Sequence, residues 1–358
     1  MTKRIGILTS GGDCPGLNAA IRGVARATYE RMEDVELIGI ADGYSGLIKG
    51  DYRVMDKNEF SGILTLGGTI LGTARTPFKD MRKIGIDNVD KVANMVRNYE
   101  KMGLDCLCTL GGNGTHKTAN LLAEEGLNII GLPKTIDNDL WGTDVTFGFH
   151  TAVDIATDVI DRVHTTAASH GRVLVVELMG NRAGWLTIYA GVAGGADVVI
   201  IPEIPYEREV VVEAVRKRAE HGKAFSIVAI AEGAMRTDEC ELKRKDIREK
   251  RIADGFTTIS ARIAHVIETT TGIETRTVVP GHVQRGGSPS AYDRVLSTKF
   301  GVQAAELIYK KKFGYTVALK NGILTENKLS DVAGKTKLVT QNSDIVRAAR
   351  NIGICLGD

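Results

Sequence analysis

The chain has 358 residues, 43% of them hydrophobic, which is enough to bury a sizeable core in two domains or in one large α/β domain. Its 46 lysines and arginines nearly balance its 44 aspartates and glutamates, and the net charge of +2 excludes a bulk attraction for nucleic acid or an anionic membrane. No stretch approaches the roughly 18 apolar residues of a membrane span, so we expect a cytoplasmic protein with no membrane or nucleic-acid partner.

Short runs rich in isoleucine, valine and leucine alternate with glycine turns and helical patterns along the chain. Strands are expected over residues 4–9, 35–40, 105–110 and 128–132, and in a second series over residues 173–178, 198–201 and 226–231. This alternation is typical of βαβ units whose parallel sheet is buried on both faces. It predicts an α/β fold of two doubly wound, mostly parallel-sheet lobes, with the active site in the cleft between them.

Three further segments have simple structural interpretations. Residues 150–164 have a helical pattern with one apolar side, and we expect this helix to cross from one lobe to the other. The charge run over residues 236–251 mixes both signs, which favours a solvated helical face over a basic binding patch. The five cysteines show neither CxxC nor zinc-type spacing, so we expect reduced thiols, with Cys106 and Cys108 packed in the core.

Two glycine-rich turns resemble each other. The segments TSGGD (residues 9–13) and TLGGN (residues 109–113) each follow an expected strand and precede a helical pattern. Two such turns in one lobe can point their backbone N–H groups at the same anion, although a glycine pair after a strand is also a common tight turn. Neither segment has the GxxxxGK[ST] pattern of a P-loop or the GxGxxG pattern of a dinucleotide site.

The loop GLPKTIDNDLWGT (residues 131–143) places one lysine, two threonines and two aspartates directly after an apolar strand. A surface loop can carry mixed charges for solubility alone. The alternative is a catalytic loop in which a cation and two carboxylates serve phosphate chemistry.

Four segments together favour the catalytic interpretation. They are SGGDCPGLNAAIRG (10–23), LGGNGTHKTA (110–119), LPKTIDNDLWGTD (132–144) and GHVQRGGSPSAYDR (281–294). With them the chain resembles the 6-phosphofructokinase family from residue 4 to about residue 310. The resemblance implies transfer of a phosphoryl group from ATP to the 1-hydroxyl of fructose 6-phosphate in glycolysis, with Mg²⁺ as cofactor. It also implies a donor lobe of residues 1–148 and about 283–315, and a fructose 6-phosphate lobe of residues 149–282 and about 316–358.

The TIDND string matches the family's catalytic loop. Asp137 corresponds to the base that accepts the hydroxyl proton. Thr135 can donate to the transferred phosphoryl group, Lys134 adds a cation beside it, and Asp139 can bind the metal's hydration shell.

The resemblance also implies two sets of binding residues. The nucleotide donor would contact Gly12, Arg75, Thr76, Gly112, Asn113, Gly114 and Thr115, and the metal would be held by Asn113 and Asp139. Fructose 6-phosphate would contact Thr135, Ile136, Asp137, Arg172, Met179, Gly180, Asn181, Glu232, Arg276, His282, Val283, Gln284 and Arg285. Guanidinium groups suit phosphate because their forked donors match its oxygens. In this family Arg172 and Arg276 reach into a neighbouring subunit, which implies a homodimer or homotetramer with shared active sites.

The chain departs from the commonest bacterial pattern at several positions. Asn113 replaces an aspartate, and Asn181 replaces an arginine whose role the neighbouring Arg182 could take over. Diphosphate-using members usually have an aspartate at the position of Gly114 and a lysine at that of Lys134, so this chain is mixed. An aspartate at position 114 would repel the α-phosphate of ATP, and this chain has glycine there. Lys134 helps to hold diphosphate but does not exclude ATP, so we expect ATP as the donor.

Three alternatives follow from the same residues. The first is a diphosphate-dependent fructose 6-phosphate 1-phosphotransferase. The second is a non-catalytic paralogue that binds sugar phosphates, although such a protein has no chemical reason to retain Thr135, Asp137 and Asp139. The third is an NAD kinase or lipid kinase, which would not need the arginine and histidine residues expected to bind the 6-phosphate.

Overall fold

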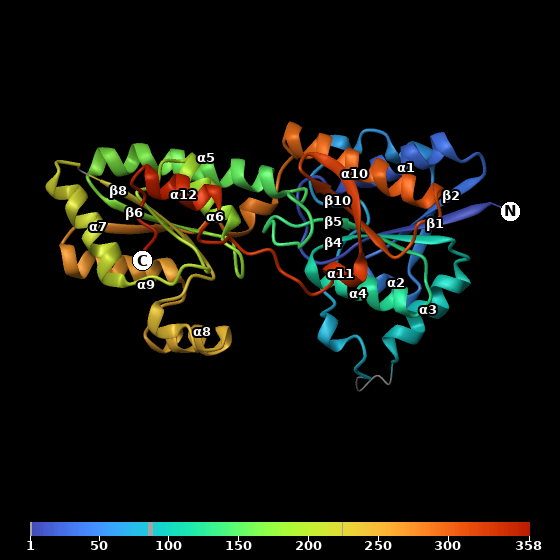
Figure 1. The fold of residues 1–358 in the computed structure, drawn as a ribbon, viewed down its shortest axis with the longest axis horizontal. Coiled ribbons are helices and arrows are strands. Elements are labelled where there is room, and N and C mark those ends of the chain that lie inside the picture. Colours follow the sequence, from blue (N-terminus) through green and yellow to red (C-terminus); the bar gives the residue numbers. More distant parts are fainter. Residues whose placement is uncertain (1, 85–88, 224) are drawn as a thin grey trace. The chain divides into compact units, whose positions relative to one another are not determined.

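The computed structural model describes residues 2–84, 89–223 and 225–358, which form two compact units (Figure 1). The first unit contains Met1–Ile136, Leu140–Thr151 and Arg285–Lys337, and the second contains Asp137–Asp139, Ala152–Gln284 and Leu338–Asp358. Residues 316–337 were expected in the sugar-phosphate lobe, but they belong to the first unit. The reason is that a strand from this segment pairs with the sheet of the first unit.

The larger sheet belongs to the first unit and has seven strands within the described residues. They are β1 (Lys3–Thr9), β2 (Val35–Ile40), β3 (Tyr52–Met55), β4 (Cys106–Gly111), β5 (Ile129–Pro133), β10 (Tyr315–Lys320) and β11 (Ile323–Lys328). Their order is β11-β10-β5-β4-β1-β2-β3, and only the outermost strands β3 and β11 pair in antiparallel fashion. The central strands β1, β4 and β5 are therefore parallel neighbours whose carboxyl ends share one edge.

Helices cover both faces of the larger sheet. One face carries α1 (Leu17–Arg31) and α10 (Ala291–Tyr309), and the other carries α2 (Tyr44–Lys49), α3 (Lys91–Lys101), α4 (Asn113–Glu124) and α11 (Leu329–Val332) (Figure 1). The central strands are almost continuously apolar because both of their faces are buried. Cys106 and Cys108 are free thiols in this core, as predicted.

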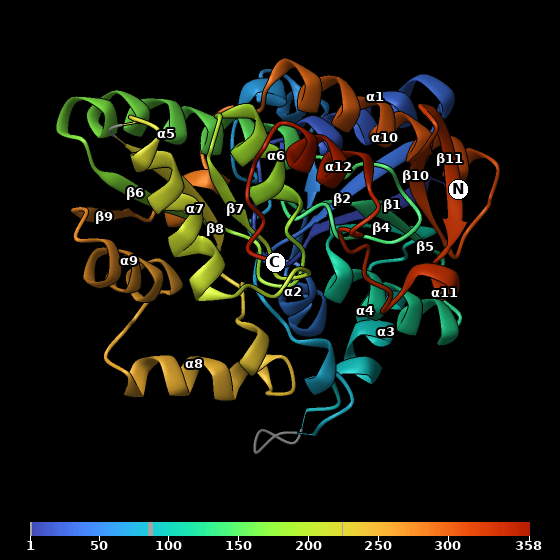
Figure 2. The ribbon, with the colours of Figure 1, turned by 60° about the vertical axis from the view of Figure 1, so that its left-hand side comes forward.

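The smaller sheet belongs to the second unit and contains four parallel strands within the described residues. They are β6 (Val173–Leu178), β7 (Val198–Ile200), β8 (Ser226–Ala231) and β9 (Thr275–Val278), in the order β7-β8-β6-β9. Its helices are α5 (Phe149–His170), α6 (Trp185–Ala193) and α12 (Asp344–Asn351) on one face, and α7 (Arg208–Glu220) and α9 (Ile259–Thr271) on the other (Figure 2). The outer edge of β7 pairs with Cys355, whose carbonyl accepts from the backbone N–H of Val199 at 2.8 Å.

The fold class predicted from the apolar runs is confirmed. Two sheets, both mostly or wholly parallel, lie between helical layers. The helix expected over residues 150–164 extends over Phe149–His170, and its first turn belongs to the first unit while the remainder belongs to the second. No helix among the described residues has both the length and the apolarity that a bilayer span requires.

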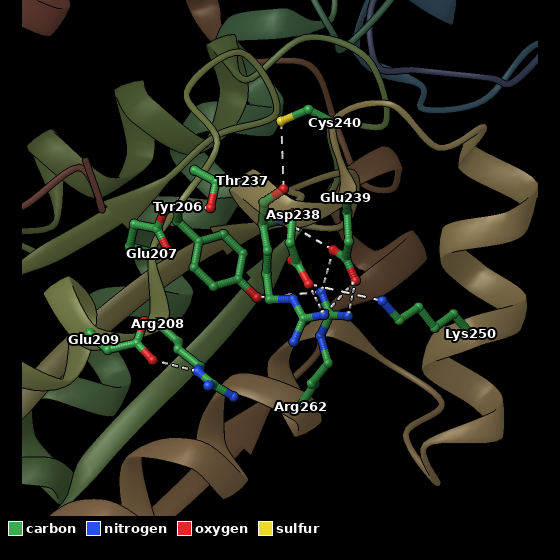
Figure 3. Close-up of polar contacts among 11 residues, drawn as sticks. Tyr206, Glu207, Arg208, Glu209, Thr237, Asp238, Glu239, Cys240, Lys250 and Arg262 are labelled. Atoms are coloured by element: carbon green, nitrogen blue, oxygen red, sulfur yellow. Dashed lines mark hydrogen bonds and ion pairs between the residues drawn. The ribbon is translucent and has the colours of Figure 1, made fainter.

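The charge run at 236–251 forms the arm of the second unit that lies apart from both helical layers in Figures 1 and 2. Ile247 is the one buried residue of its helix α8 (Arg244–Ala253), which agrees with the predicted solvated face. The start of the arm is different, because Glu239 is fully buried there. Its carboxylate accepts hydrogen bonds from Arg262 Nη1 at 2.5 Å and Nη2 at 2.9 Å (Figure 3).

The Glu239–Arg262 pair anchors the arm to α9. Burial by itself raises the pKa of the Glu239 carboxyl, but the hydrogen bonds from Arg262 and from the Arg236 backbone outweigh it, so the pKa lies below its usual value. The guanidinium of Arg262 is buried as well, and its Nη2 also donates to the Tyr206 hydroxyl at 3.4 Å. Arg262 therefore depends on Glu239 for compensation of its charge, whereas Glu239 also lies 3.5 Å from Arg236 Nη2.

Replacing Glu239 with glutamine should lower the free energy of unfolding by about 3 kcal/mol, because Arg262 would remain buried without a counter-charge. Urea unfolding followed by circular dichroism measures this loss. The matched control is Glu249→Gln on α8, where the carboxylate makes an exposed pair with Lys245 at 3.5 Å. Equal unfolding free energies for the two variants would contradict the anchoring role of the buried pair.

Candidate active site

Three loops meet at the carboxyl edge of the larger sheet. They follow β1, β4 and β5, and backbone hydrogen bonds join them: Ser10 N–H donates to Leu110 O at 3.0 Å and Lys134 N–H donates to Gly111 O at 3.1 Å. The two glycine turns predicted from the sequence therefore lie side by side. This edge of a parallel sheet is where α/β proteins bind their ligands.

The buried side chain of Lys134 contacts the first glycine turn. The residue is only 3% exposed, and its ammonium group donates a hydrogen bond to the Gly12 carbonyl. The hydroxyl of Thr115 donates to the Ser10 carbonyl at 3.3 Å and thereby ties the helix that follows the second turn to the first turn. A buried cation is thus fixed at the point where the backbone of the first turn would approach an anion.

Gly12 leaves room for the guanidinium of Arg285. A Cβ atom at Gly12 would lie 2.8 Å from Arg285 Nη1, which itself donates to the Asp13 carbonyl at 3.1 Å. Arg285 belongs to the first unit and lies against this turn, and its expected contact with the sugar phosphate stays a prediction. Its Nε is buried and has no hydrogen-bond partner in the described part of the chain, so it retains a donor for a ligand.

The second glycine turn opens α4. Asn113 Nδ2 donates to Lys335 O at 3.0 Å and to Thr336 Oγ1 at 3.2 Å, whereas its Oδ1 is buried without a partner among the described residues. A Cβ atom at Gly114 would meet nothing within 4 Å, so the space beside the start of the helix is open.

His116 braces this turn and was not predicted. Its ring nitrogens contact Gly112 O at 3.1 Å and Thr316 Oγ1 at 2.8 Å. Burial lowers the pKa of the imidazole to about 4, and the charge of Lys134 acts in the same direction. The ring is therefore neutral near pH 7 and adds no charge to the turn. Its place directly after GGNGT was the only signal in the sequence.

Arg75 and Thr76 lie on a loop beside the first glycine turn, since the preceding Ala74 carbonyl accepts from the Gly11 N–H at 3.2 Å. The Arg75 side chain is exposed and forms no ion pair with any described residue. It is therefore available to bind an anion from solution.

The predicted catalytic loop continues from Lys134. Thr135 is nearly buried, and its carbonyl accepts from Thr146 Oγ1 at 2.7 Å. Asn138 is buried and has a φ of 50°, a left-handed conformation that asparagine tolerates better than most residues. Asp137 and Asp139 on either side of it are partly exposed.

In the second unit, Met179–Asn181 and Glu232 lie together at the carboxyl edge of the smaller sheet. Glu232 N–H donates to Leu178 O at 2.9 Å, and Gly233 N–H donates to Gly180 O at 3.2 Å. Gln284 is fully buried, and its amide bonds Met179 N at 3.2 Å and Gly281 O at 3.0 Å. Its side chain thus joins two protein segments, and its expected contact with the sugar stays a prediction. His282 and Val283 beside it are exposed.

Arg172 and Arg276 lie at the opposite edge of the smaller sheet. Arg172 precedes β6 and Arg276 is paired in register with Leu174 at the start of that strand. Both guanidinium groups bind Glu274, with Arg172 Nε donating to its carboxylate at 2.5 Å. The length of β6, six residues, at about 3.3 Å per residue separates these arginines from Glu232 by roughly 20 Å.

The side-chain oxygen atoms near the second glycine turn suit a magnesium ion that is held largely through water and phosphate oxygens. No group of three or more metal-binding side chains occurs within residues 2–84, 89–223 and 225–358. Mg²⁺ does not need such a cage, because it keeps several waters and is commonly held by one or two side chains plus phosphate oxygens. The unpartnered Oδ1 of Asn113 is an oxygen donor of the required kind.

These features define a doubly wound α/β protein with two glycine turns and a buried cation at the carboxyl edge of its larger sheet, an arrangement that suits phosphate groups, and with two carboxylates on the loop after β5. The profile of the family described as Phosphofructokinase matches residues 4–308, and the chain belongs to this family. The family predicted from the four segments is therefore confirmed.

Curated relatives match over nearly the whole chain. The ATP-dependent 6-phosphofructokinase of Spirochaeta thermophila is 53% identical over 100% of this chain and 98% of its own length. The ATP-dependent 6-phosphofructokinase 3 of Bacteroides thetaiotaomicron is 48% identical over 99% of this chain and 100% of its own length. The predicted enzyme class agrees with these names.

Solved structures share the fold. The phosphofructokinase of Saccharomyces cerevisiae superposes with a TM-score of 0.77 and 29% identity, covering 92% of this chain but 45% of its own. The pyrophosphate-dependent phosphofructokinase of Marinobacter aquaeolei gives a TM-score of 0.80 with 21% identity, covering 99% of this chain and 92% of its own. At that identity the second comparison establishes the fold alone.

Proposed function

We propose that this protein transfers the terminal phosphoryl group of ATP to the 1-hydroxyl of fructose 6-phosphate, forming fructose 1,6-bisphosphate and ADP in glycolysis in the cytoplasm. The observation that carries the proposal is the buried ammonium of Lys134, bound to the Gly12 carbonyl at the start of the loop that contains Thr135, Asp137 and Asp139. Phosphoryl transfer needs a positioned base and fixed donors for the phosphate oxygens, and this loop offers both.

Each residue of the loop has a step in the reaction. The Asp137 carboxylate accepts the proton of the attacking hydroxyl, and the electron pair of the hydroxyl oxygen forms the new bond to phosphorus. The bond from that phosphorus to the bridging oxygen breaks at the same time, and its electron pair leaves with ADP. The Thr135 hydroxyl donates to an oxygen of the transferred group, and Lys134 offsets its charge. Asn113 and Asp139 would hold a hydrated Mg²⁺, whose contribution is to neutralise the charge of the donor phosphates.

The residue at position 114 favours ATP over diphosphate as the phosphoryl donor. The space beside Gly114 is open, so nothing there opposes the α-phosphate of a nucleotide. The donor would also contact Gly12, Arg75, Thr76, Gly112 and Thr115. The names of the curated relatives specify ATP as well. A diphosphate-dependent reaction is the second candidate, because Lys134 suits that donor equally.

Fructose 6-phosphate would be held by residues at the carboxyl edge of the smaller sheet. Glu232 accepts from sugar hydroxyls, and Met179, Gly180 and Asn181 pack beside the ring. His282 and Arg285 bind the 6-phosphate. Within one chain Arg172 and Arg276 lie at the other edge of the sheet, roughly 20 Å from Glu232. They therefore serve the site of a second subunit, and the protein acts as a homo-oligomer.

The experiment measures formation of fructose 1,6-bisphosphate by purified wild-type protein and by two variants, alone and in mixed oligomers. Wild type should form product with ATP and Mg²⁺, while Asp137→Asn and Arg172→Ala should each be strongly impaired. In a dimer of one Asp137→Asn subunit and one Arg172→Ala subunit, the site of the first subunit lacks both Asp137 and the neighbour's Arg172. The site of the second subunit has both residues intact. Random mixing should therefore restore about a quarter of wild-type activity, because half of the pairs are mixed.

The matched control is a mixture of Arg172→Ala with Arg276→Ala. Each subunit then supplies one defective arginine to its neighbour, so no intact site forms and no recovery is expected. Recovery in the control, or none in verified Asp137→Asn and Arg172→Ala oligomers, would rule out shared sites. A wild-type protein that forms no product with either donor would rule out the proposed reaction itself.

A further inference from the structure

One side chain of the arm that contains α8 contacts the carboxyl edge of the smaller sheet. Arg244, the first residue of α8, donates from Nη1 to the Gly233 carbonyl at 3.0 Å. A Cβ atom at Gly233 would lie 2.8 Å from the same nitrogen and 2.0 Å from the Asn181 carbonyl oxygen. The guanidinium therefore lies next to the two strand ends that carry Glu232 and Asn181.

A second arginine adds to the positive charge at this point. Arg182 follows Asn181 in the chain and is exposed. Burial lowers the pKa of Arg244, the charge of Arg182 lowers it further, and Glu203 opposes both effects. The Glu203 carboxylate is already used, because it accepts from Gly184 N–H at 3.0 Å and Val339 N–H at 2.9 Å.

Neither arginine has an ion-pair partner in the part of the chain that the structure describes. Two neighbouring guanidinium groups that repel each other are stabilised when an anion binds both. Phosphate is the anion whose oxygens the forked donors of arginine match best.

We propose that Arg244 and Arg182 form a second phosphate-binding point at the carboxyl edge of the smaller sheet, which recognises the 1-phosphate of a doubly phosphorylated sugar. This inference rests on the proposed function, since fructose 1,6-bisphosphate is the product of that reaction. Asn181 replaces an arginine of the commonest bacterial pattern. The inference assigns the role of that arginine to Arg244 of the charged arm together with Arg182. The 6-phosphate is assigned above to His282 and Arg285 and to Arg172 and Arg276 of a second subunit, so the two phosphates have separate partners.

The competing role for Arg244 is purely structural, as a tether between the arm and Gly233. A tether would affect both sugars equally when it is lost, because it would act through the position of Glu232. A phosphate-binding point discriminates between them, because fructose 6-phosphate has no 1-phosphate. The ratio of the two affinities therefore separates the two roles.

The test is calorimetric titration of the full chain, without a phosphoryl donor, with fructose 1,6-bisphosphate and with fructose 6-phosphate. Arg244→Met and Arg182→Met should each weaken bisphosphate binding about tenfold, the loss typical of one charge-assisted hydrogen bond, and should change fructose 6-phosphate binding less than about twofold. Arg244→Lys should keep part of the bisphosphate affinity. Arg248→Met, at an exposed position one turn further along α8, is the matched control and should change neither affinity.

Equal weakening for both sugars in Arg244→Met, with no selective loss in the exposed Arg182→Met, would show a tether and overturn the inference. Unchanged bisphosphate affinity in both variants would overturn it as well, while the proposed function would stand. A wild-type protein that binds neither sugar would overturn both.

Discussion

Asp137→Asn is expected to lower the turnover number about a thousandfold while leaving the affinity for fructose 6-phosphate nearly unchanged. The amide has the same shape as the carboxylate but cannot accept the hydroxyl proton as attack begins. The following residue, Asn138, is buried in a left-handed conformation that fixes the course of the loop, so the substitution should not alter the backbone. The loss therefore falls on the chemical step.

Steady-state kinetics with ATP in excess, combined with titration of fructose 6-phosphate, separate the chemical step from binding. Asp144→Asn provides the matched control, because it makes the same change at an exposed position a few residues further along the same segment. Its turnover should remain close to that of wild type. Near-normal turnover in Asp137→Asn would mean that another group accepts the proton.

Gly114→Asp should reduce kcat/KM for ATP by roughly a hundredfold. Two like charges about 5 Å apart at an effective dielectric near 20 repel by roughly 3 kcal/mol, which corresponds to this factor. The new side chain has room, since nothing lies within 4 Å of its Cβ position. It also stands in the first turn of α4, where a negative charge favours the helix. The variant should therefore fold normally and lose the nucleotide selectively.

The measurement is kcat/KM for ATP and for diphosphate in wild type, Gly114→Asp and Gly114→Asn. Wild type should prefer ATP, and the uncharged asparagine should retain most of that activity. If the asparagine variant lost as much as the aspartate variant, side-chain volume rather than charge would control the donor. A wild type that turns over only with diphosphate would show that Lys134 outweighs the glycine.

Much of the fold could be predicted from apolar runs, because strands buried on both faces are nearly continuous in sequence. The expected strands over residues 35–40, 173–178 and 226–231 coincide with β2, β6 and β8. The strands β3 and β11 were not predicted, since they lie at sheet edges and consist mostly of exposed or half-buried residues. Without β11 and its partner β10, the segment 316–337 could not be assigned to the first unit.

The candidate site could be predicted where local sequence determines it. The glycine turns and the loop from Lys134 to Asp139 are such segments, because a strand end followed by a turn sets their position. The contact of Arg285 with Asp13 spans 272 residues and depends on how the whole first unit packs. The burial of Gln284 and the approach of Arg244 to Gly233 depend on packing in the same way, and no periodic pattern indicates either.

The pairing of Cys355 with the outer edge of β7 affects the order in which the chain matures on the ribosome. The partner of Val198 is synthesised about 150 residues later, which takes roughly 10–30 s at ordinary translation rates of 5–20 residues per second. During that interval the backbone groups at this edge have no strand beside them, and unpaired edges are the places where nascent chains join one another. The first unit receives its last strand, β11, before residue 355 is made. The smaller sheet is therefore completed second, although all four of its strands are synthesised earlier than β10 and β11.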